Sequence, residues 1–235
     1  MTPSTSRGAV LQPWDRPPGV STAGSLYALP PESRPVAAAL LHAQGHWVHV
    51  DVLTEGGQAV GGVAVETLAA VRAALPAARV EVPVIERGAG PAAPGPDDLL
   101  GRLLAARPQR LVLPPAWCAA ESPAARRIRT SGGELWTEVA PSVGIDVVRG
   151  LGDAVDGALV MLIEPGTREV ADLSRLEAVR QLAGHLPVGV DGGVRLEHTA
   201  ACLAAGAVHL VSGRALLQPP HPVVTPVPVP LEGAR

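Results

Sequence analysis

Eight apolar runs that alternate with helix-like segments predict a single (β/α)8 barrel of the α/β class, a TIM barrel. Strand–helix alternation implies parallel pairing, and eight repeats of the unit imply a closed sheet. The 235 residues, 47% of them hydrophobic, can bury one large core, and single barrels reach this length. An open doubly wound sheet is the structural alternative, but its Gly-rich phosphate fingerprint after the first strand is missing.

The individual elements follow from the period of the apolar residues. Runs rich in β-branched and apolar residues predict strands at 25–29, 47–53, 79–85, 110–113, 135–139, 158–163, 188–191 and 209–212. Stretches rich in Ala, Leu and Arg with helical period predict helices at 34–44, 65–76, 97–107, 122–131, 146–152, 173–184 and 196–205. Each predicted helix therefore follows a predicted strand.

The two ends of the chain depart from this pattern. Residues 1–23 are rich in Pro, Ser, Thr and Gly without a period, so we expect a flexible N-terminal arm before a barrel at 24–217. The sequence "LLQPPHPVVTPVPVP" cannot form the usual eighth helix, because Pro removes backbone donors and clashes with the preceding turn. We expect that helix to be missing, or replaced by a Pro-rich extended tail at 218–235. The arm, the tail or a second subunit should then cover the last strand, and a homo-oligomer is expected.

Composition and charge narrow the class of protein. The net charge of −3, with acids and bases interspersed, argues against nucleic-acid binding. No apolar run reaches about 18 residues and no signal sequence is evident, so we expect a cytoplasmic protein without a membrane partner. All 19 basic residues are Arg, which excludes a Schiff-base lysine and leaves Arg, backbone N–H groups or helix N-termini to hold a phosphate.

Three polar residues fall where the chemistry of such barrels is found, at the C-terminal ends of strands. His49 and Asp51 lie two residues apart in "HWVHVDVL", so their side chains share one face of the strand. Asp191 ends another predicted strand in "VGVDGGV" and is followed by Gly192 and Gly193. Alone, the His-x-Asp pair is as compatible with a structural pair as with a ligand pair. Its buried polar groups need a partner, which is either a divalent metal or Asp191 across the barrel mouth.

Four segments, "HWVHVDVL", "VMLIEPG", "VGVDGGV" and "AGAVHLVSGRALL", resemble the ribulose-phosphate 3-epimerase family in order and separation, over residues 25–216. The resemblance implies an isomerase of carbohydrate metabolism that inverts C3 of a ketopentose 5-phosphate. In that family one carboxylate removes a proton and another returns one on the opposite face, with a metal to stabilise the enediolate. Here Asp51 and Asp191 match the two catalytic carboxylates. His49, Asp51 and Asp191 match ligands of a divalent metal, zinc, manganese or iron.

The phosphate contacts implied by the resemblance lie in the last three strand–helix loops. They are Gly166, Arg168, Gly192, Gly193, Gly213 and Arg214. Arg168 and Arg214 stand where the family has glycine or small residues, so the phosphate site is expected to be rebuilt around Arg side chains.

Two other departures concern the centre of the site. Pro83 in "VEVPVI" occupies the position of the family's third-strand metal histidine, and Ala28 is assigned to that of its first-strand serine. Glu81, two residues before Pro83, could supply a compensating carboxylate or pair with an inward Arg. Two hypotheses follow: an epimerase-like enzyme acting on a small phosphorylated sugar or related metabolite, or a repurposed barrel that binds a metabolite or partner or catalyses another reaction.

Overall fold

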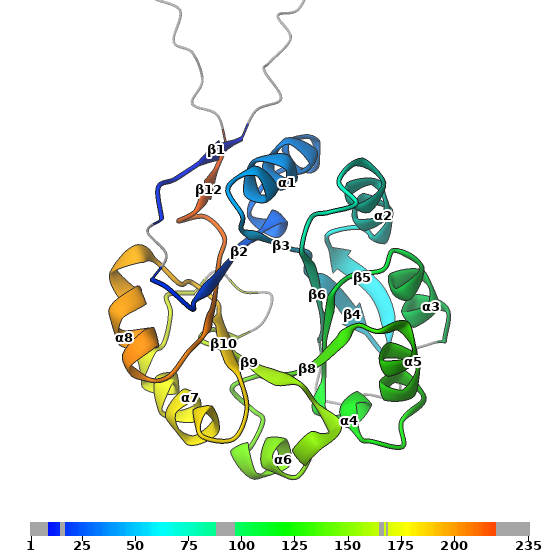
Figure 1. Ribbon diagram of the computed structural model, residues 1–235, viewed down its shortest axis with the longest axis vertical. Helices are drawn as coiled ribbons and strands as arrows, with labels where there is room; N and C mark the ends of the chain where they lie inside the picture. Colours follow the sequence, from blue (N-terminus) through cyan, green and yellow to red (C-terminus); the bar gives the residue numbers. More distant parts are fainter. Residues whose placement is uncertain (1–8, 15–16, 88–96, 165–166, 168, 220–235) are drawn as a thin grey trace, which may run out of the picture.

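A computed structural model describes residues 9–14, 17–87, 97–164, 167 and 169–219. Eight parallel strands close into a barrel (Figure 1). In chain order they are β2 (Ser21–Ser25), β3 (Trp47–His49), β6 (Val80–Glu86), β7 (Arg110–Leu113), β8 (Glu134–Val139), β9 (Gly157–Met161), β10 (Val188–Asp191) and β11 (His209–Ser212). Parallel pairing of β11 with β2 and of β3 with β6 completes the ring, so the predicted fold class is confirmed.

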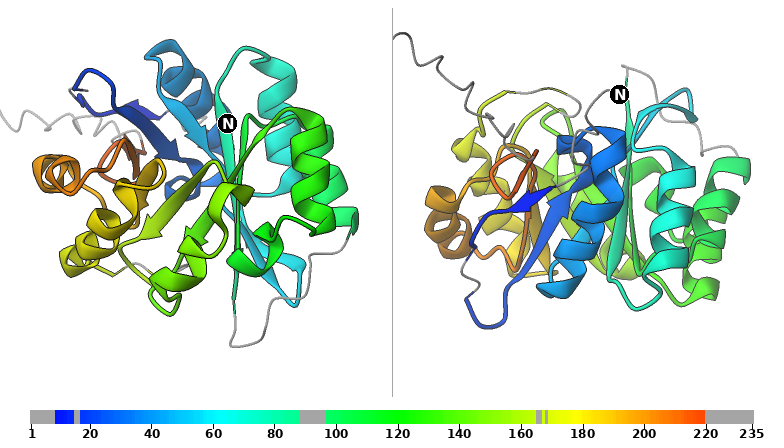
Figure 2. Two further views of the ribbon diagram at one scale, coloured as in Figure 1. Left: turned by 60° about the horizontal axis from the view of Figure 1, so that its bottom comes forward. Right: turned by 90° about the horizontal axis from the view of Figure 1, so that it is seen from above.

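Helices pack around the outside of the strands (Figure 2). They are α1 (Arg34–Ala43), α2 (Val65–Ala74), α3 (Asp97–Ala105), α4 (Pro115–Cys118), α5 (Pro123–Ser131), α6 (Ile145–Arg149), α7 (Leu176–Ala183) and α8 (Thr199–Ala204). Seven of them overlap the predicted helical segments, and the short α4 is an addition. The helix α5 shows why the sequence folds this way: Ser122 caps its first turn by accepting from Ala125 N, Pro123 opens it and Gly132 ends it at φ 76°.

The first barrel strand lies earlier than predicted. We expected it at 25–29, but β2 spans Ser21–Ser25 and Leu26–Ala28 forms a 3-10 turn. The prediction failed because "STAGS" has small side chains instead of the apolar β-branched ones that mark a strand. The helix α1 explains Gly24, since a Cβ at this position would lie 2.5 Å from the side chain of Leu41. The strand begins inside the segment assigned to the arm.

The second predicted strand is divided in two. It separates into β3 and β4 (Val52–Glu55), and β4 pairs with both β6 and the antiparallel β5 (Gln58–Gly62). The hairpin β4–β5 was not predicted, although Gly56 and Gly57, both at positive φ, are typical of a two-residue hairpin turn. Thr54 and the backbone N–H groups of both glycines bind the Glu86 carboxylate. This hairpin extends the wall of the barrel beyond Asp51.

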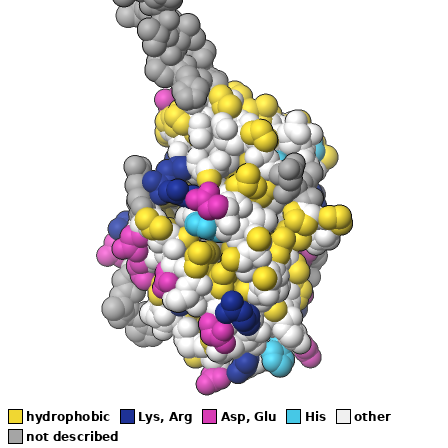
Figure 3. All heavy atoms as spheres, turned by 90° about the vertical axis from the view of Figure 1, so that its left-hand side faces the viewer, with side chains coloured by type: hydrophobic (Ala, Val, Ile, Leu, Met, Phe, Trp, Pro, Cys, Tyr) yellow, Lys and Arg dark blue, Asp and Glu magenta, His cyan; other side chains and the backbone are white. Residues whose placement is uncertain are grey.

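Residues 213–219, which follow the last barrel strand β11, form no helix, as predicted. A two-stranded ribbon covers this side of the barrel instead. In this ribbon β1 (Val10–Leu11) pairs antiparallel with β12 (Leu217–Gln218), and Gln12 N donates to Leu216 O at 2.8 Å. Trp14, Leu216 and Leu217 belong to the main hydrophobic core. The face on this side of the molecule also carries hydrophobic side chains across its middle (Figure 3). Residues 1–8 and 220–235, which include most of the expected tail, lie outside the described residues.

The barrel interior has its own hydrophobic cluster, separate from the layer between strands and helices. It consists of Ala23, Trp47, Val112, Trp136, Leu159, Met161 and Val211. These side chains fill the middle of the barrel, so polar residues at its two ends are held on a rigid, close-packed support.

Candidate active site

The three polar residues singled out in the sequence meet at the C-terminal end of the barrel. His49 ends β3, Asp51 follows it, and Asp191 ends β10. His49 Nε2 lies 3.2 Å from Asp51 Oδ1 and 3.5 Å from Asp191 Oδ2. All three residues are buried, and His49 has no exposed surface. The imidazole thus lies between two carboxylates that come from different parts of the barrel.

A third carboxylate fixes the orientation of the imidazole. Glu81 in β6 places Oε1 2.8 Å from His49 Nδ1. A carboxylate accepts from an N–H, so we assign the proton on that side to Nδ1, which leaves Nε2 directed at Asp51 and Asp191. This is the arrangement in which an outer carboxylate holds a metal-binding histidine in one tautomer.

The two aspartates differ in their protonation. Burial opposes ionisation of Asp51, but the charge of His49 and the hydrogen bonds from His49 and Ser25 outweigh it and lower the pKa of Asp51. Burial raises the pKa of Asp191 to about 7, although the charge of His49 opposes the rise. Burial also disfavours the imidazolium, yet Asp51 and Glu81 raise the pKa of His49 well above its ordinary value. At neutral pH the pair therefore combines an ionised carboxylate with one poised to exchange its proton.

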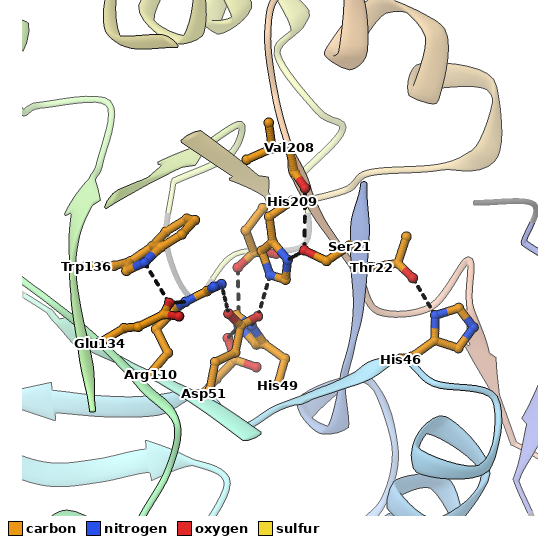
Figure 4. A network of polar contacts seen from close by, with 12 residues as sticks. Ser21, Thr22, His46, His49, Asp51, Arg110, Glu134, Trp136, Val208 and His209 are labelled. Atoms are coloured by element: carbon orange, nitrogen blue, oxygen red, sulfur yellow. Dashed lines mark hydrogen bonds and ion pairs between the residues drawn. The ribbon is translucent and has the colours of Figure 1, made fainter. Parts of the chain in front are cut away.

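The polar network around His49 continues into the barrel to Arg110 and His209 (Figure 4). Glu81 Oε1 accepts from His209 Nε2 at 2.8 Å, and Glu81 Oε2 accepts from Arg110 Nη1 at 3.0 Å. The Arg110 guanidinium lies between the rings of Trp136 and Trp47, at 3.7 and 4.4 Å from their centroids. Glu81 is therefore the structural partner of an inward Arg, and this alternative is confirmed. Its pKa lies well below the ordinary value, since His209 and His49 outweigh the effect of burial.

The serine next to Asp51 is the main correction to the predicted site. Ser25, at the end of β2, donates from Oγ to Asp51 Oδ2 at 2.7 Å. The assignment of the first-strand position to Ala28 was wrong, because the strand itself was placed four residues too late. Ala28 lines the pocket beside it. Pro83 does lie in β6 as predicted, paired with Val112, and has no side-chain donor to offer.

A pocket of about 610 Å³ opens above these residues. Its lining includes Gly192, Gly193, Gly213 and Arg214, four of the six predicted phosphate residues. The backbone at Gly192 and Gly193 has φ of 100° and 67°, and a Cβ at Gly192 would lie 2.7 Å from Ile163. Glycine is required there and leaves backbone open to a ligand. Gly166 and Arg168 lie outside the described residues.

Arg195 and the N-terminal residues Gln12 to Trp14 also line this pocket. The sequence did not single them out. Arg195 follows the glycine loop by two residues, and this proximity was the available signal. The N-terminal residues could not be found, because only the β1–β12 pairing brings them to the pocket.

The donor set fits a divalent cation. One ligand atom each from His49, Asp51 and Asp191 lie within 4.8 Å of one another. One imidazole nitrogen and two carboxylate oxygens suit zinc, manganese or iron, and three protein ligands are characteristic of sites with open positions. The hydrogen bond at Nδ1 makes Nε2 of His49 the ligand atom, which would bind a cation after losing the proton that it shares with Asp51.

Fold and site together define a (β/α)8 barrel with a buried His–Asp–Asp centre beneath a glycine-rich loop. The profile of the ribulose-phosphate 3-epimerase family matches residues 91–217. This chain belongs to that family. A ribulose-phosphate 3-epimerase from Candida glabrata is 31% identical over 104 residues, which are 42% of each chain. The match thus spans less than half the length of that relative.

Solved structures support the fold alone. A tryptophan synthase α-subunit from Pyrococcus furiosus is 14% identical with a TM-score of 0.56, over 84% of this chain and 88% of that one. Phosphoribosyl anthranilate isomerase from Thermus thermophilus is 19% identical with the same TM-score, over 83% and 88%. Among the described residues, none of the helices has the length and apolar character needed to span a membrane.

Proposed function

We propose that the protein is an epimerase that inverts the carbon next to the carbonyl of a phosphorylated ketose. The observation that carries this proposal is the pair Asp51, which follows β3, and Asp191, which ends β10; both approach the same imidazole nitrogen. Inversion needs an acid and a base on opposite faces of one carbon. Asp51 is suited to remove the proton, and Asp191 is suited to deliver one to the other face. Without a bound cation, the pKa of Asp51 is lowered and that of Asp191 is raised to about 7, so the two carboxyl groups differ in protonation before any metal binds.

The remaining residues would orient the substrate and hold its charge. A divalent cation held by His49, Asp51 and Asp191 would supply positive charge for the enediolate oxygens. Ser25 keeps one Asp51 oxygen occupied, which directs the other toward the centre. The phosphate would lie against the backbone of Gly192, Gly193 and Gly213, and Arg214 would add charge.

Exchange of the C3 proton of D-ribulose 5-phosphate with solvent deuterium tests this proposal. Asp51→Asn and Asp191→Asn should each lower exchange by roughly 10²–10⁴-fold, as expected when a general acid or base is removed. Asp146→Asn is the matched control, because this aspartate lies on α6 with its side chain 99% exposed. Equal rates in all four proteins would contradict the assignment.

The alternative is a repurposed barrel that binds a metabolite or partner without epimerising it, or catalyses a different reaction. Pro83 favours it, since the third strand contributes no metal ligand. This alternative would be supported if the wild type bound D-ribulose 5-phosphate but did not exchange its C3 proton with solvent in the presence of any divalent metal tested.

We also propose that the chain forms a homo-oligomer. Exposed apolar side chains on the covered side, among them Val10 and Leu196, support an interface there. Light scattering coupled to size exclusion would test it, and a monomer at micromolar concentration would contradict it.

A further inference from the structure

A buried carboxyl group at the end of β8 has no role in the mechanism proposed above. Glu134, Trp136 and Glu138 alternate along β8, so their side chains share one face. Trp136 belongs to the cluster inside the barrel, and therefore Glu138 also points inward, at the C-terminal end. Glu138 pairs with Leu159 of the neighbouring strand β9, and Met161 follows two residues later in that strand. Met161 in turn pairs with Asp191, and both line the pocket.

One carboxyl oxygen of Glu138 lacks a partner in the part of the chain that the structure describes. The residue is 5% exposed, and its Oε1 has no hydrogen-bond partner among the described residues. Buried polar groups are almost always paired, so an unpartnered carboxyl group calls for an explanation. Glu81, in the same barrel, shows the contrast: its two oxygens bind His49, His209 and Arg110.

Glu138 is an acid rather than a carboxylate at neutral pH. Burial, together with the charges of Asp191 and Glu164, raises the pKa of Glu138 to about 8. A protonated carboxyl group carries an O–H donor, and Oε1 of Glu138 has no partner among the described residues. The group lies at the C-terminal end of the barrel, in a strand that neighbours β9, which carries the pocket residue Met161. A metal ligand is less well supported, because the group of donors within reach of one cation among the described residues consists of His49, Asp51 and Asp191.

We propose that Glu138 is a substrate-binding residue, whose carboxyl group donates a hydrogen bond to a hydroxyl or carbonyl oxygen of the bound ketose phosphate. This inference rests on the proposed function and assigns one contact of the same site. The ligand would supply a partner that Oε1 lacks among the described residues. The unsatisfied carboxyl group therefore lowers the stability of the ligand-free protein, and it provides a contact for the bound ligand.

Two substitutions separate this role from a structural one. Glu138→Gln keeps a donor of the same shape, whereas Glu138→Leu fills a similar volume without a donor. We expect Glu138→Leu to weaken binding of D-ribulose 5-phosphate about tenfold, as for the loss of one hydrogen bond, and Glu138→Gln to bind within about threefold of wild type. Without ligand, Glu138→Leu should have a higher thermal midpoint than wild type, since it removes an unsatisfied buried group. A merely structural carboxyl group would give the opposite shift.

Calorimetry measures the affinity of each protein for D-ribulose 5-phosphate. A separate titration without the sugar phosphate measures its affinity for Mn²⁺. Equal affinity of wild type and Glu138→Leu for the sugar phosphate would overturn the inference. Loss of Mn²⁺ binding in both variants would also overturn it, because Glu138 would then be a metal ligand. Wild type that binds the sugar phosphate without C3 exchange would refute the proposed function, yet leave the comparison of affinities valid. Wild type that binds neither ribulose 5-phosphate nor any other ketose phosphate would overturn both.

Discussion

Nδ1 of His49 lies 2.8 Å from Oε1 of Glu81, and both side chains are completely buried. This contact joins the candidate metal site to the interior of the barrel, because the same carboxylate also binds His209 and Arg110. The carboxylate of Glu81 thus compensates the charge or the N–H groups of three buried side chains, His49, His209 and Arg110. Removing that acid leaves them without compensation.

We expect Glu81→Gln to lower the free energy of unfolding by roughly 3–5 kcal/mol, the cost typical of breaking a buried ion pair from one side. Urea denaturation followed by circular dichroism measures it. Glu177→Gln is the control, since this glutamate lies at the surface and pairs only locally with Arg180 and Gln181. An unfolding midpoint as high in Glu81→Gln as in the control would mean that the ion set contributes no stability.

The metal-free protein should be most stable on the acid side of neutrality. Burial raises the pKa of Asp191 to about 7 and that of Glu138 to about 8, so the folded protein keeps protons that the unfolded chain has released. Each group then lowers the free energy of unfolding by roughly 1.4 kcal/mol per pH unit, between about pH 4 and its folded pKa. The lowered pKa values of Asp51 and Glu81 act in the other direction, and their stabilisation is lost only as the pH falls below about 4.

His49 adds to the decline at higher pH. Its pKa is raised in the folded protein, so its contribution is complete below about pH 6.5 and disappears as the pH rises through the folded value. Denaturation between pH 4 and 9 in the presence of a chelator measures the slope. Glu138→Gln should flatten it below pH 8, whereas Glu177→Gln should not. Identical slopes in the three proteins would contradict the raised pKa of Glu138.

Metal affinity should depend on the third strand. Glu81, Pro83 and Ile85 alternate along β6; Glu81 binds His49 and Ile85 lines the pocket, so Pro83 points inward between them. We expect Pro83→His to bind Mn²⁺ at least about tenfold more tightly than wild type. His49→Ala should abolish binding, and Glu81→Gln should weaken it by roughly 10–100-fold, as for other outer-shell partners.

Isothermal titration calorimetry measures these affinities, and wild-type affinity should fall as the pH decreases because the ligands must lose their protons. Metal retained by His49→Ala would place the site elsewhere.

The ribbon that replaces the eighth helix should contribute measurably to stability. Trp14 is 8% exposed and packs in the main core, so Trp14→Ala should cost about 3 kcal/mol. Val10→Ala is the control in the same segment, because Val10 is 39% exposed and should change stability by less than about 0.5 kcal/mol. Comparable losses in the two variants would indicate that β1 stabilises through its backbone pairing rather than through Trp14.

Strands with apolar β-branched residues were predictable because burial on both faces leaves a continuous hydrophobic run, as in β7 and β10. The strand β2 was placed too late, because its residues are small. Gly24 among them is required by the close approach of Leu41 in α1, a tertiary contact that local propensity does not reveal. Because the strand was placed too late, Ser25 was not recognised as the residue that binds Asp51. His49, Asp51 and Asp191 were predictable because strand ends of a barrel converge.

Glu138 and His209 were not predictable in the same way. Neither belongs to a recognisable motif, and the importance of each depends on which neighbours the barrel brings within reach. The glycine loop at Gly192 was visible as "DGG", but the approach of Ile163 that requires it was not.

The ribbon of β1 and β12 joins segments from opposite ends of the described chain. During synthesis on the ribosome, β1 has no partner until Leu217 and Gln218 have left the exit tunnel. The core around Trp14 and Leu216 must therefore form late, and a nascent chain that already contains most of the barrel still exposes this apolar side. Chaperone binding should consequently persist until the last strand has emerged, and closure of the ribbon should be a late, slow event in folding.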